Sequence, residues 1–285
     1  MRDSVTVSGI EFASVSVIIP CYRCTETIER AVNSVVTQTL LPKEILLAED
    51  FSGDDGKTLA LLYQIQKDHH GKLDIRVLSL KKNSGPGGAR NAGWEAAKQP
   101  YIAFLDSDDT WHCEKLRIQF SYMQNNNGVA VTGHCYIVLN RNNQSPEDLA
   151  ISTLSYTGIS PISLLFKNRF PTSSVMLKSD IPFRFATGKR AAEDTLLWQQ
   201  ISFSGFLVVR INVPLVYYFK ALYGEGGLSS ALWTMEKGEL HNFNTLLKTD
   251  NINFVLYISA VFFSILKFIR RSIITLMKSI SNNFF

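Results

Sequence analysis

The chain has 285 residues, of which 46% are hydrophobic and 19% charged, and its formal net charge at pH 7 is +4. This composition is typical of a globular protein and excludes a disordered or fibrous chain, while the length allows one large domain or two small ones. The charge is too small to make nucleic acid an expected partner, although clustered cations could favour phosphates or an anionic membrane.

The cysteine content and the N-terminal residues indicate the compartment. The four cysteines, Cys21, Cys24, Cys113 and Cys135, are too few for the disulfide framework of a small secreted protein. Residues 1–20 lack the charged start and the apolar run of a signal peptide. We therefore expect the protein to stay in a reducing compartment inside the cell.

The N-terminal part of the chain alternates short apolar runs with helical patterns. Because strand, helix and strand follow one another repeatedly, the pattern predicts an α/β fold with a parallel sheet covered on both faces. Strands are predicted at 15–19, 45–49, 75–78 and 101–105, and helices at 26–40, 57–68 and 88–98.

Two later segments also have readable patterns. Residues 140–148 are polar and predict a surface loop. Residues 203–219 predict further strand material, which we expect Pro214 to break because proline has no N–H for the sheet ladder.

The C-terminal segment changes character. Residues 252–266 are nearly all apolar, but the run is shorter than the roughly 20 residues that a spanning helix needs. At about 100° per residue, cations and apolar side chains fall on opposite sides of a helix, which predicts a basic amphipathic helix that lies on a membrane. Packing against the domain or against a second copy is the alternative. The cations are Lys267, Arg270, Arg271 and Lys278, and the apolar residues are Ile265, Ile269, Ile273, Leu276 and Ile280.

Polar residues that could bind a ligand follow each predicted strand. Ligands of open parallel sheets bind outside the carboxyl ends of the strands, so we expect these residues to share one ligand site. They are Pro20 to Tyr22, Asp50, residues 81–93, and Asp106, Asp108 and Asp109.

The three aspartates of the last group lie within four residues. Such carboxylates repel one another unless a cation neutralises them, and Mg²⁺ or Mn²⁺ prefers oxygen ligands and keeps substrate phosphates in its shell. Asp106 and Asp108 form an Asp-x-Asp that suits a metal bridging the protein to a diphosphate. A capped turn is the alternative interpretation.

Two other segments have both a structural and a functional interpretation. The glycines of 85–88, followed by Arg90, suit a phosphate at a helix N-terminus, or simply form a flexible connector. Glu193 and Asp194 precede a helical pattern, where acids are usually favourable caps. A transferase that acts on an alcohol, however, needs a general base, and a carboxylate in a cleft is a common choice.

Taken together in this order and spacing, these segments resemble family 2 glycosyltransferases over roughly residues 14–220. The resemblance implies the GT-A fold, a mainly parallel nucleotide-binding sheet flanked by helices, and an inverting mechanism. It divides the chain into a nucleotide-sugar half at 14–115, an acceptor half at 116–220, a lid or linker at 221–250 and a membrane-associating helix at 251–285. The matching segments are VSVIIPCY at 15–22, Glu49-Asp50 with the following FSGDDGKT, NSGPGGARNAG at 83–93, FLDSDDTW at 104–111 and Glu193-Asp194.

The resemblance implies a donor site at the first three strand ends. Pro20, Tyr22 and Asp50 would contact the nucleobase and ribose, usually of uridine, with Asp50 accepting a hydrogen bond from the base. Arg90 would lie toward the donor diphosphate.

The resemblance also implies a metal site and a catalytic base. Asp106 and Asp108 would bind Mn²⁺ or Mg²⁺, with Asp108 as the direct ligand and Asp109 in support. Asp194 would deprotonate the acceptor hydroxyl, and Glu193 would orient this base or the acceptor.

The sequence departs from the common family pattern in two places. The first strand-end loop reads Cys21-Tyr22-Arg23-Cys24 where many relatives have a Tyr-Asn pair. After Asp194 the sequence reads Thr-Leu-Leu-Trp-Gln-Gln, without the Gln-x-x-Arg-Trp motif of processive synthases. We therefore expect addition of a single sugar rather than polymer extrusion.

The expected partners are a UDP-sugar donor and a sugar acceptor on undecaprenyl diphosphate, as in bacterial O-antigen or capsule assembly. The enzyme would be peripheral on the cytoplasmic face of the inner membrane, with no nucleic acid partner. Lys189, Arg190 and Lys220 are candidates for holding the acceptor diphosphate.

Three other functions remain as alternatives. Cys21-x-x-Cys24 after a strand is also the pattern of a thioredoxin-like redox protein, although that function leaves the acidic residues without a role. A nucleotidyltransferase would use the same metal-bound carboxylates, and an inactive binding protein would keep the fold without the reaction.

Overall fold

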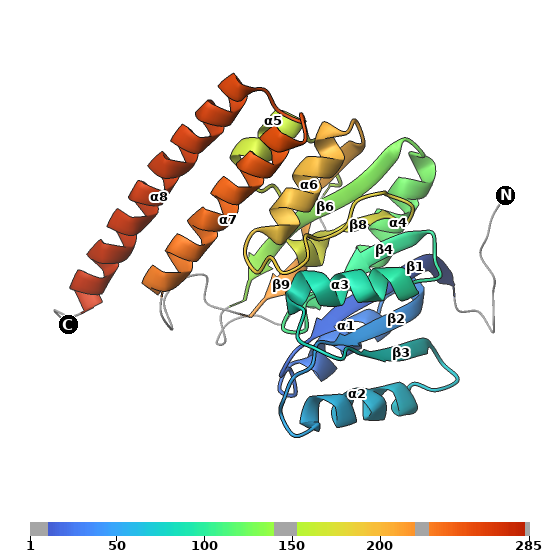
Figure 1. Cartoon of the computed structure of the whole chain (residues 1–285). Helices are drawn as coiled ribbons and strands as arrows, with labels where there is room; N and C mark the ends of the chain where they lie inside the picture. The colour runs from blue at the N-terminus through green and yellow to red at the C-terminus, as the bar shows by residue number, and fades with distance from the viewer. Residues whose placement is uncertain (1–10, 140–152, 220–227, 283–285) are drawn as a thin grey trace.

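The computed structural model describes residues 11–139, 153–219 and 228–282, and within these ranges nine strands form one sheet. The strand order is β3-β2-β1-β4-β8-β6-β9-β5, and β7 pairs with β9. A hairpin of two long helices, α7 and α8, stands beside this layered domain (Figure 1). The loop predicted at 140–148 lies outside the described residues.

The N-terminal half of the sheet is parallel throughout, as the alternating pattern predicts. Each predicted strand and helix of this half is present, with shifts of a few residues at the ends. The strands are β1 (Phe12–Cys21), β2 (Leu41–Glu49), β3 (Asp74–Ser79) and β4 (Tyr101–Phe104), and the helices are α1 (Ile28–Val36), α2 (Lys57–Asp68) and α3 (Gly85–Ala96).

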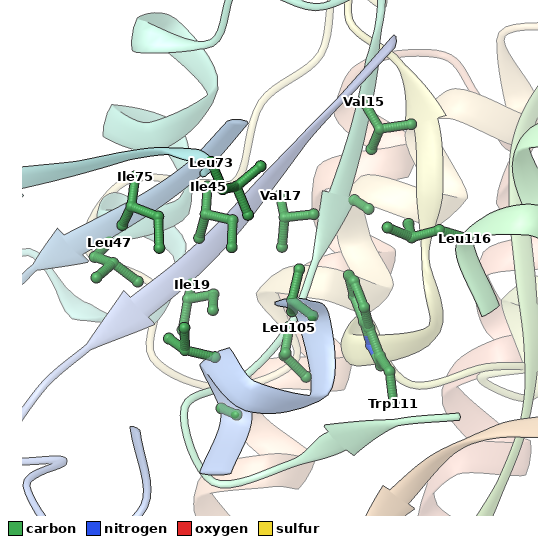
Figure 2. Close-up of a cluster of buried hydrophobic side chains, with 14 of the residues drawn as sticks. Val15, Val17, Ile19, Ile45, Leu47, Leu73, Ile75, Leu105, Trp111 and Leu116 are labelled. Carbon is green, nitrogen blue, oxygen red and sulfur yellow. The ribbon is translucent and has the colours of Figure 1, made fainter. Parts of the chain in front are cut away.

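Strand β1 lies inside the sheet and is buried on both faces. Val15, Val17 and Ile19 belong to one apolar cluster, while Ile18 belongs to a second cluster across the sheet. Figure 2 shows the first cluster, in which the side chains of β1 line up with those of the neighbouring strands. Burial on both faces explains why the end of this strand, Val17 to Ile19, is continuously apolar rather than alternating.

The C-terminal half of the sheet is mixed. Strand β8 is antiparallel to both β4 and β6, β6 is parallel to β9, and β5 and β7 are antiparallel to β9. The elements are β5 (Thr110–Trp111), α4 (Lys115–Asn125), β6 (Val129–Val138), β7 (Tyr156–Gly158), α5 (Pro161–Phe166), the short 3₁₀ helix η2 (Thr172–Ser174), β8 (Met176–Lys178), α6 (Glu193–Phe203) and β9 (Leu207–Tyr218).

The predicted break at Pro214 is wrong, because β9 runs without interruption from Leu207 to Tyr218. Its pairing with β6 changes register on both sides of Cys135, the residue opposite Pro214. On the other edge, β7 pairs with residues 209–211 and β5 with residues 216–217. Pro214 therefore lies between two paired stretches, where its missing N–H costs no ladder hydrogen bond on that edge.

The C-terminal hairpin consists of α7 (Leu228–Lys248) and α8 (Phe254–Asn282), so the predicted C-terminal helix is present. The segment predicted as a lid or linker is helical from residue 228, and residues 221–227 lie outside the described residues. A separate apolar cluster joins the hairpin to α5 and α6. Within the described part of the chain, none of the helices is both long enough and apolar enough to cross a membrane.

The two faces of α8 differ in the way the sequence predicts, but two of the predicted cations, Lys267 and Arg271, contact α7. Lys267 pairs with Glu239 at 2.9 Å and Arg271 with the buried Glu236 at 3.0 Å. The opposite side, the outer face of α8, exposes large apolar side chains at helical spacing. Among them are Phe254, Val255, Phe262, Ile273, Leu276 and Met277.

Candidate active site

The loops after β1 and β2 lie side by side because the two strands pair in parallel, with Pro20 opposite Ala48. The amide of Asp50 donates a hydrogen bond to the carbonyl of Cys21 at 2.8 Å. Tyr22 is about half exposed, whereas Asp50 is buried. The structure thus brings together the three residues that the sequence predicts for nucleobase and ribose contacts.

Asp50 also contacts the start of α3. Its Oδ1 accepts a hydrogen bond from the amide of Ser84 at 2.7 Å. Burial raises the pKa of Asp50 above its usual value, against the opposing effect of hydrogen bonds from the Ser84 and Gly85 amides. The glycine-rich segment begins a helix, as the phosphate interpretation requires. The amides of Ser84 and Gly85 at this helix start, however, already donate to the carboxylate of Asp50.

A second pair of loop residues lies next to Asp50 in strained backbone. Arg23 has φ of 47° and Phe51 has φ of 52°, values that are uncommon for residues with a side chain. The amide and Nε of Arg23 donate to Ser52 at 3.1 and 2.9 Å, and the amide of Ser52 donates to Glu49 at 2.7 Å. These bonds fix both loops, and they leave the large apolar side chain of Phe51 exposed beside Asp50.

Arg90 is the central cation of the site. Its guanidinium contacts Asp106 Oδ1 at 2.5 Å and Glu193 Oε1 at 3.3 Å, and it lies over the ring of Phe185. Burial lowers the pKa of Arg90, but Asp106 and Glu193 outweigh this effect and raise it above its usual value. Arg90 therefore ties the fourth strand end to the start of α6, although Glu193 lies 103 residues after Arg90 in the chain.

The aspartates after β4 form a turn that a distant serine stabilises. The amide of Asp109 donates to the carbonyl of Asp106 at 3.1 Å, and Arg30 donates to the carbonyl of Asp108 at 3.0 Å. The hydroxyl of Ser173, in η2, donates to Asp109 Oδ2 at 2.5 Å and accepts from the amide of Asp106 at 3.1 Å. The turn is thus held in one conformation from both sides.

A divalent cation would be held here by few protein ligands. Among the described residues, no group of three or more His, Cys, Asp or Glu side chains is arranged to bind a metal. Asp108 and the remaining oxygen of Asp106 offer the hard donors that Mg²⁺ or Mn²⁺ prefers. Magnesium is typically bound by one or two carboxylates together with substrate phosphates and water, so this donor set fits such an ion.

Glu193 and Asp194 begin α6 and lie in the same site. Asp194 Oδ2 accepts from the hydroxyl of Thr172 at 3.0 Å, and its Oδ1 accepts from the amide of Thr195 at 2.7 Å. Burial, reinforced by the negative charge of Asp194, raises the pKa of Glu193. Helix η2 therefore contacts both acidic groups, with Thr172 on Asp194 and Ser173 on Asp109.

Three site residues, Thr172, Ser173 and Tyr218, have no counterpart in the sequence prediction. Burial raises the pKa of the Tyr218 hydroxyl strongly, and the charges of Asp109, Asp106 and Asp194 add to the effect. The phenol is therefore a neutral hydrogen-bond donor within electrostatic reach of three acids. None of the three residues lies in a local motif, so only the folded structure reveals them.

Two of the cations suggested for an acceptor diphosphate are engaged with protein groups. Lys189 Nζ donates to the carbonyl of Gly238 at 2.9 Å. Arg190 donates to Asn83 at 2.6 Å, close to the start of α3 and to Asp50. Lys220 lies outside the described residues.

Cys21 and Cys24, the basis of the thiol redox alternative, are both buried free thiols. Burial raises the pKa of Cys21 well above its usual value, whereas the neighbouring side chain of Cys21 lowers the pKa of Cys24. The Cys21 thiol donates to the carbonyl of Ile19 at 3.3 Å.

The model of Glycosyl transferase family 2 matches residues 16–192, more than half of the chain. This match begins in β1, includes the acidic turn after β4, and ends directly before Glu193. The chain belongs to glycosyl transferase family 2. Membership in this family leaves the thioredoxin-like alternative without support.

Two curated relatives are named as glycosyltransferases. The Escherichia coli UDP-Glc:alpha-D-GlcNAc-diphosphoundecaprenol beta-1,3-glucosyltransferase WfgD is 33% identical over 142 residues, which are 50% of this chain and 53% of WfgD. The putative teichuronic acid biosynthesis glycosyltransferase TuaG of Bacillus subtilis is 29% identical over 213 residues, 72% of this chain and 78% of TuaG. The chain matches about half the length of WfgD.

Among solved structures, S. aureus TarS (residues 1–349) in complex with UDP-GlcNAc has a similar fold. The TM-score is 0.63 at 20% sequence identity, and the likeness covers 87% of this chain and 70% of the TarS chain. This family 2 chain therefore has the GT-A fold that the sequence resemblance implies.

Proposed function

We propose that the protein is an inverting glycosyltransferase that moves one sugar from a UDP-sugar to a hydroxyl of a lipid-linked sugar acceptor. The observation that carries this proposal is the meeting of Asp50, the turn at 106–109 and Asp194 at one edge of the sheet. Arg90 and η2 join the turn to the start of α6, and Asp50 binds the start of α3, the helix that carries Arg90. Family membership supports the same reaction, and so does the similarity to WfgD, which is named as a glucosyltransferase.

The donor nucleotide would occupy the loops after β1 and β2. Half-exposed Tyr22 offers an aromatic face for the base, next to Pro20. Asp50 has one carboxylate oxygen bound to the Ser84 amide, which fixes the orientation of the other. This arrangement suits a nucleobase that donates an N–H, as uracil does. The donor named for WfgD is also a UDP-sugar.

The diphosphate would lie over the turn at 106–109. We propose that Asp108, with Asp106, holds Mn²⁺ or Mg²⁺ there; when bound, the ion stabilises the charge of the leaving diphosphate. Asp109 supports the turn through Ser173. Arg90 is too deeply buried and too fully engaged by two acids to serve as a free phosphate ligand, so we assign it the role of holding Asp106 and Glu193 in place.

Asp194 would act as the general base. As the acceptor oxygen attacks the anomeric carbon, its proton passes to the Asp194 carboxylate, and the bond between this carbon and the diphosphate oxygen breaks, releasing UDP. The attack comes from the side opposite the departing oxygen, which inverts the anomeric configuration. Thr172 donates to Asp194 Oδ2 and so fixes the carboxylate that receives the proton.

The acceptor would be a sugar on undecaprenyl diphosphate, as the name of WfgD states for that enzyme. A substrate of this kind resides in a membrane, and the apolar outer face of α8 suits contact with the acyl boundary. We therefore propose peripheral attachment to the cytoplasmic face of the inner membrane, in bacterial surface polysaccharide assembly such as that of O-antigen or capsule.

The test is release of nucleoside diphosphate from a panel of UDP-, GDP- and dTDP-sugars, with a synthetic diphosphate-lipid sugar as acceptor. Each donor is measured with Mn²⁺, with Mg²⁺ and with chelator. We expect acceptor-stimulated release from a UDP-sugar that stops when the metal is removed, and that Asp108→Asn also prevents.

Other results would contradict specific parts of the proposal. Equal release in chelator would remove the metal from the mechanism. Pyrophosphate release from a nucleoside triphosphate would favour a nucleotidyltransferase, and UDP binding without turnover of any donor would favour an inactive relative.

A further inference from the structure

The residues that lead into α6 have an unusual backbone. Ala192 directly precedes Glu193, is buried, and has φ of 54°, in the left-handed region that residues with a Cβ rarely occupy. Such a conformation is energetically unfavourable and persists only where neighbouring groups hold it. It sets the direction in which α6 begins, because the carbonyl of Ala192 accepts the first hydrogen bond of that helix, from Leu196 at 3.2 Å.

Helix α7 supplies the groups that hold this segment. Asn242, fully buried in α7, donates from Nδ2 to the carbonyl of Ala192 at 2.9 Å. Lys189 Nζ donates to the carbonyl of Gly238 at 2.9 Å. At Gly238 a Cβ would lie only 2.7 Å from the carbonyl oxygen of Ala191, so the close approach of the two backbones requires glycine there.

The position of α7 is fixed in turn by α8. Glu236 and Glu239, on the same turns of α7 as Gly238, bind Arg271, Lys267 and Ser264 of α8. The Ser264 hydroxyl donates to Glu236 at 2.8 Å, and both groups are buried. The hairpin therefore presents a firmly held surface to residues 189–192, and it lies outside the residues that the family model matches.

We propose that α7 positions the catalytic base, with Asn242 and Gly238 holding Ala192 in its strained conformation so that α6 directs Asp194 toward the acceptor hydroxyl. Asn242 and Gly238 are thus positioning residues that act through the backbone of residues 191–192. The proposal rests on the proposed function, because it takes Asp194 as the base.

The first test compares Asn242→Ala and Asn242→Asp with the wild type. Asparagine and aspartate have nearly the same shape, but an aspartate cannot donate the hydrogen bond to Ala192. We expect both variants to lower kcat at least tenfold, while the KM for the donor and the Kd for UDP stay within twofold. Leu62→Ala is the control, because Leu62 is a fully buried residue of α2 and belongs to an apolar cluster that includes no residue of α6 or α7.

The control separates positioning from general loss of stability. Below its unfolding temperature, Leu62→Ala should keep kcat within threefold of the wild type, even with a lower thermal midpoint than Asn242→Ala. A kcat that follows the thermal midpoint in all three variants would overturn the proposal.

Gly238→Ala tests the proposal with a substitution that should favour the helix but lower kcat. In a helix interior, alanine is intrinsically more favourable than glycine. The added methyl group nevertheless displaces residues 191–192, so we expect a lower kcat without loss of UDP binding. A variant with unchanged kcat would show that the close approach at Gly238 is not needed for catalysis.

Amide hydrogen exchange tests the positioning role of α7 even if the wild type turns over none of the donors. We expect the amides at the start of α6, residues 193–198, to exchange at least tenfold faster in Asn242→Ala than in the wild type, with unchanged exchange in β1 and β2. An inactive wild type would contradict the proposed function alone, whereas unchanged exchange at α6 would contradict the positioning role of α7.

Discussion

At the scale of single residues, Arg90 makes the most consequential contacts of the site, because it is buried between Asp106 and Glu193. Removing one partner of a buried ion pair leaves the other charge uncompensated. Arg90→Met should therefore lower the free energy of unfolding by about 3–5 kcal/mol, as measured by urea denaturation. The double variant Arg90→Met, Glu193→Gln should recover part of this loss. A loss below about 1 kcal/mol in Arg90→Met alone would show that the ion pairs of Arg90 are as weak as those on a protein surface.

A second residue-scale prediction concerns pH. Burial, with the charge of Lys115 adding to the effect, lowers the pKa of His134 to about 3. Its unfolded pKa is about 6.5, so between these values the unfolded chain binds more protons and stability falls as pH falls. From pH 7 to pH 5 we expect His134 to account for a loss of about 2 kcal/mol.

The measurement is urea unfolding of the wild type and of His134→Phe at both pH values. The variant should lose this part of the pH dependence, whatever its stability at pH 7. The same pH dependence in both proteins would mean that His134 is not the group that titrates.

Some site residues could be read from the sequence and others could not, and the difference is physical. Asp50, Asp106 and Asp194 lie next to strand or helix ends that local patterns reveal. Ser173 and Tyr218 join the site only through long-range packing, and a serine or tyrosine in an ordinary segment carries no local signal. Arg90 was found by the same local pattern, but its ion pair with Glu193 depends on the fold.

At the scale of elements, β1 to β4 and α1 to α3 could be predicted because each buries a regular set of apolar residues. The prediction at Pro214 fails because the effect of a proline on a strand depends on which edge it faces, and β5 and β7 set that edge. For α8, the helical period predicts both faces, but it does not reveal that Lys267 and Arg271 pair with Glu239 and Glu236.

The element-scale prediction concerns the outer face of α8. Phe262 and Leu276 are each 63% exposed, so replacing both with serine should leave stability within about 0.5 kcal/mol. We expect the double variant to lose at least tenfold in binding to anionic phospholipid vesicles, as measured by co-flotation. Leu207→Ser is the control, because Leu207 is 59% exposed and lies outside the hairpin. Equal binding by all three proteins would exclude this face as the lipid contact.

At the scale of the whole molecule, a parallel nucleotide-binding half, a mixed second half and a helical hairpin meet around one acidic site. The first half follows from the sequence because its strand ends carry their own motifs. The second half does not, because β6, β8 and β9 come together across long separations and only Glu193-Asp194 marks the site there. The role that we propose for α7 belongs to this scale, since it couples the hairpin to the site.

The most direct test of the account is acceptor-dependent UDP release by Asp194→Asn, with UDP binding measured by calorimetry on the same preparation. A general base contributes about 100-fold or more to the rate, so we predict a loss of at least that size with UDP affinity within twofold of the wild type. Release at the wild-type rate would contradict Asp194 as the base and, with it, the assignment of this acidic site as the centre of sugar transfer.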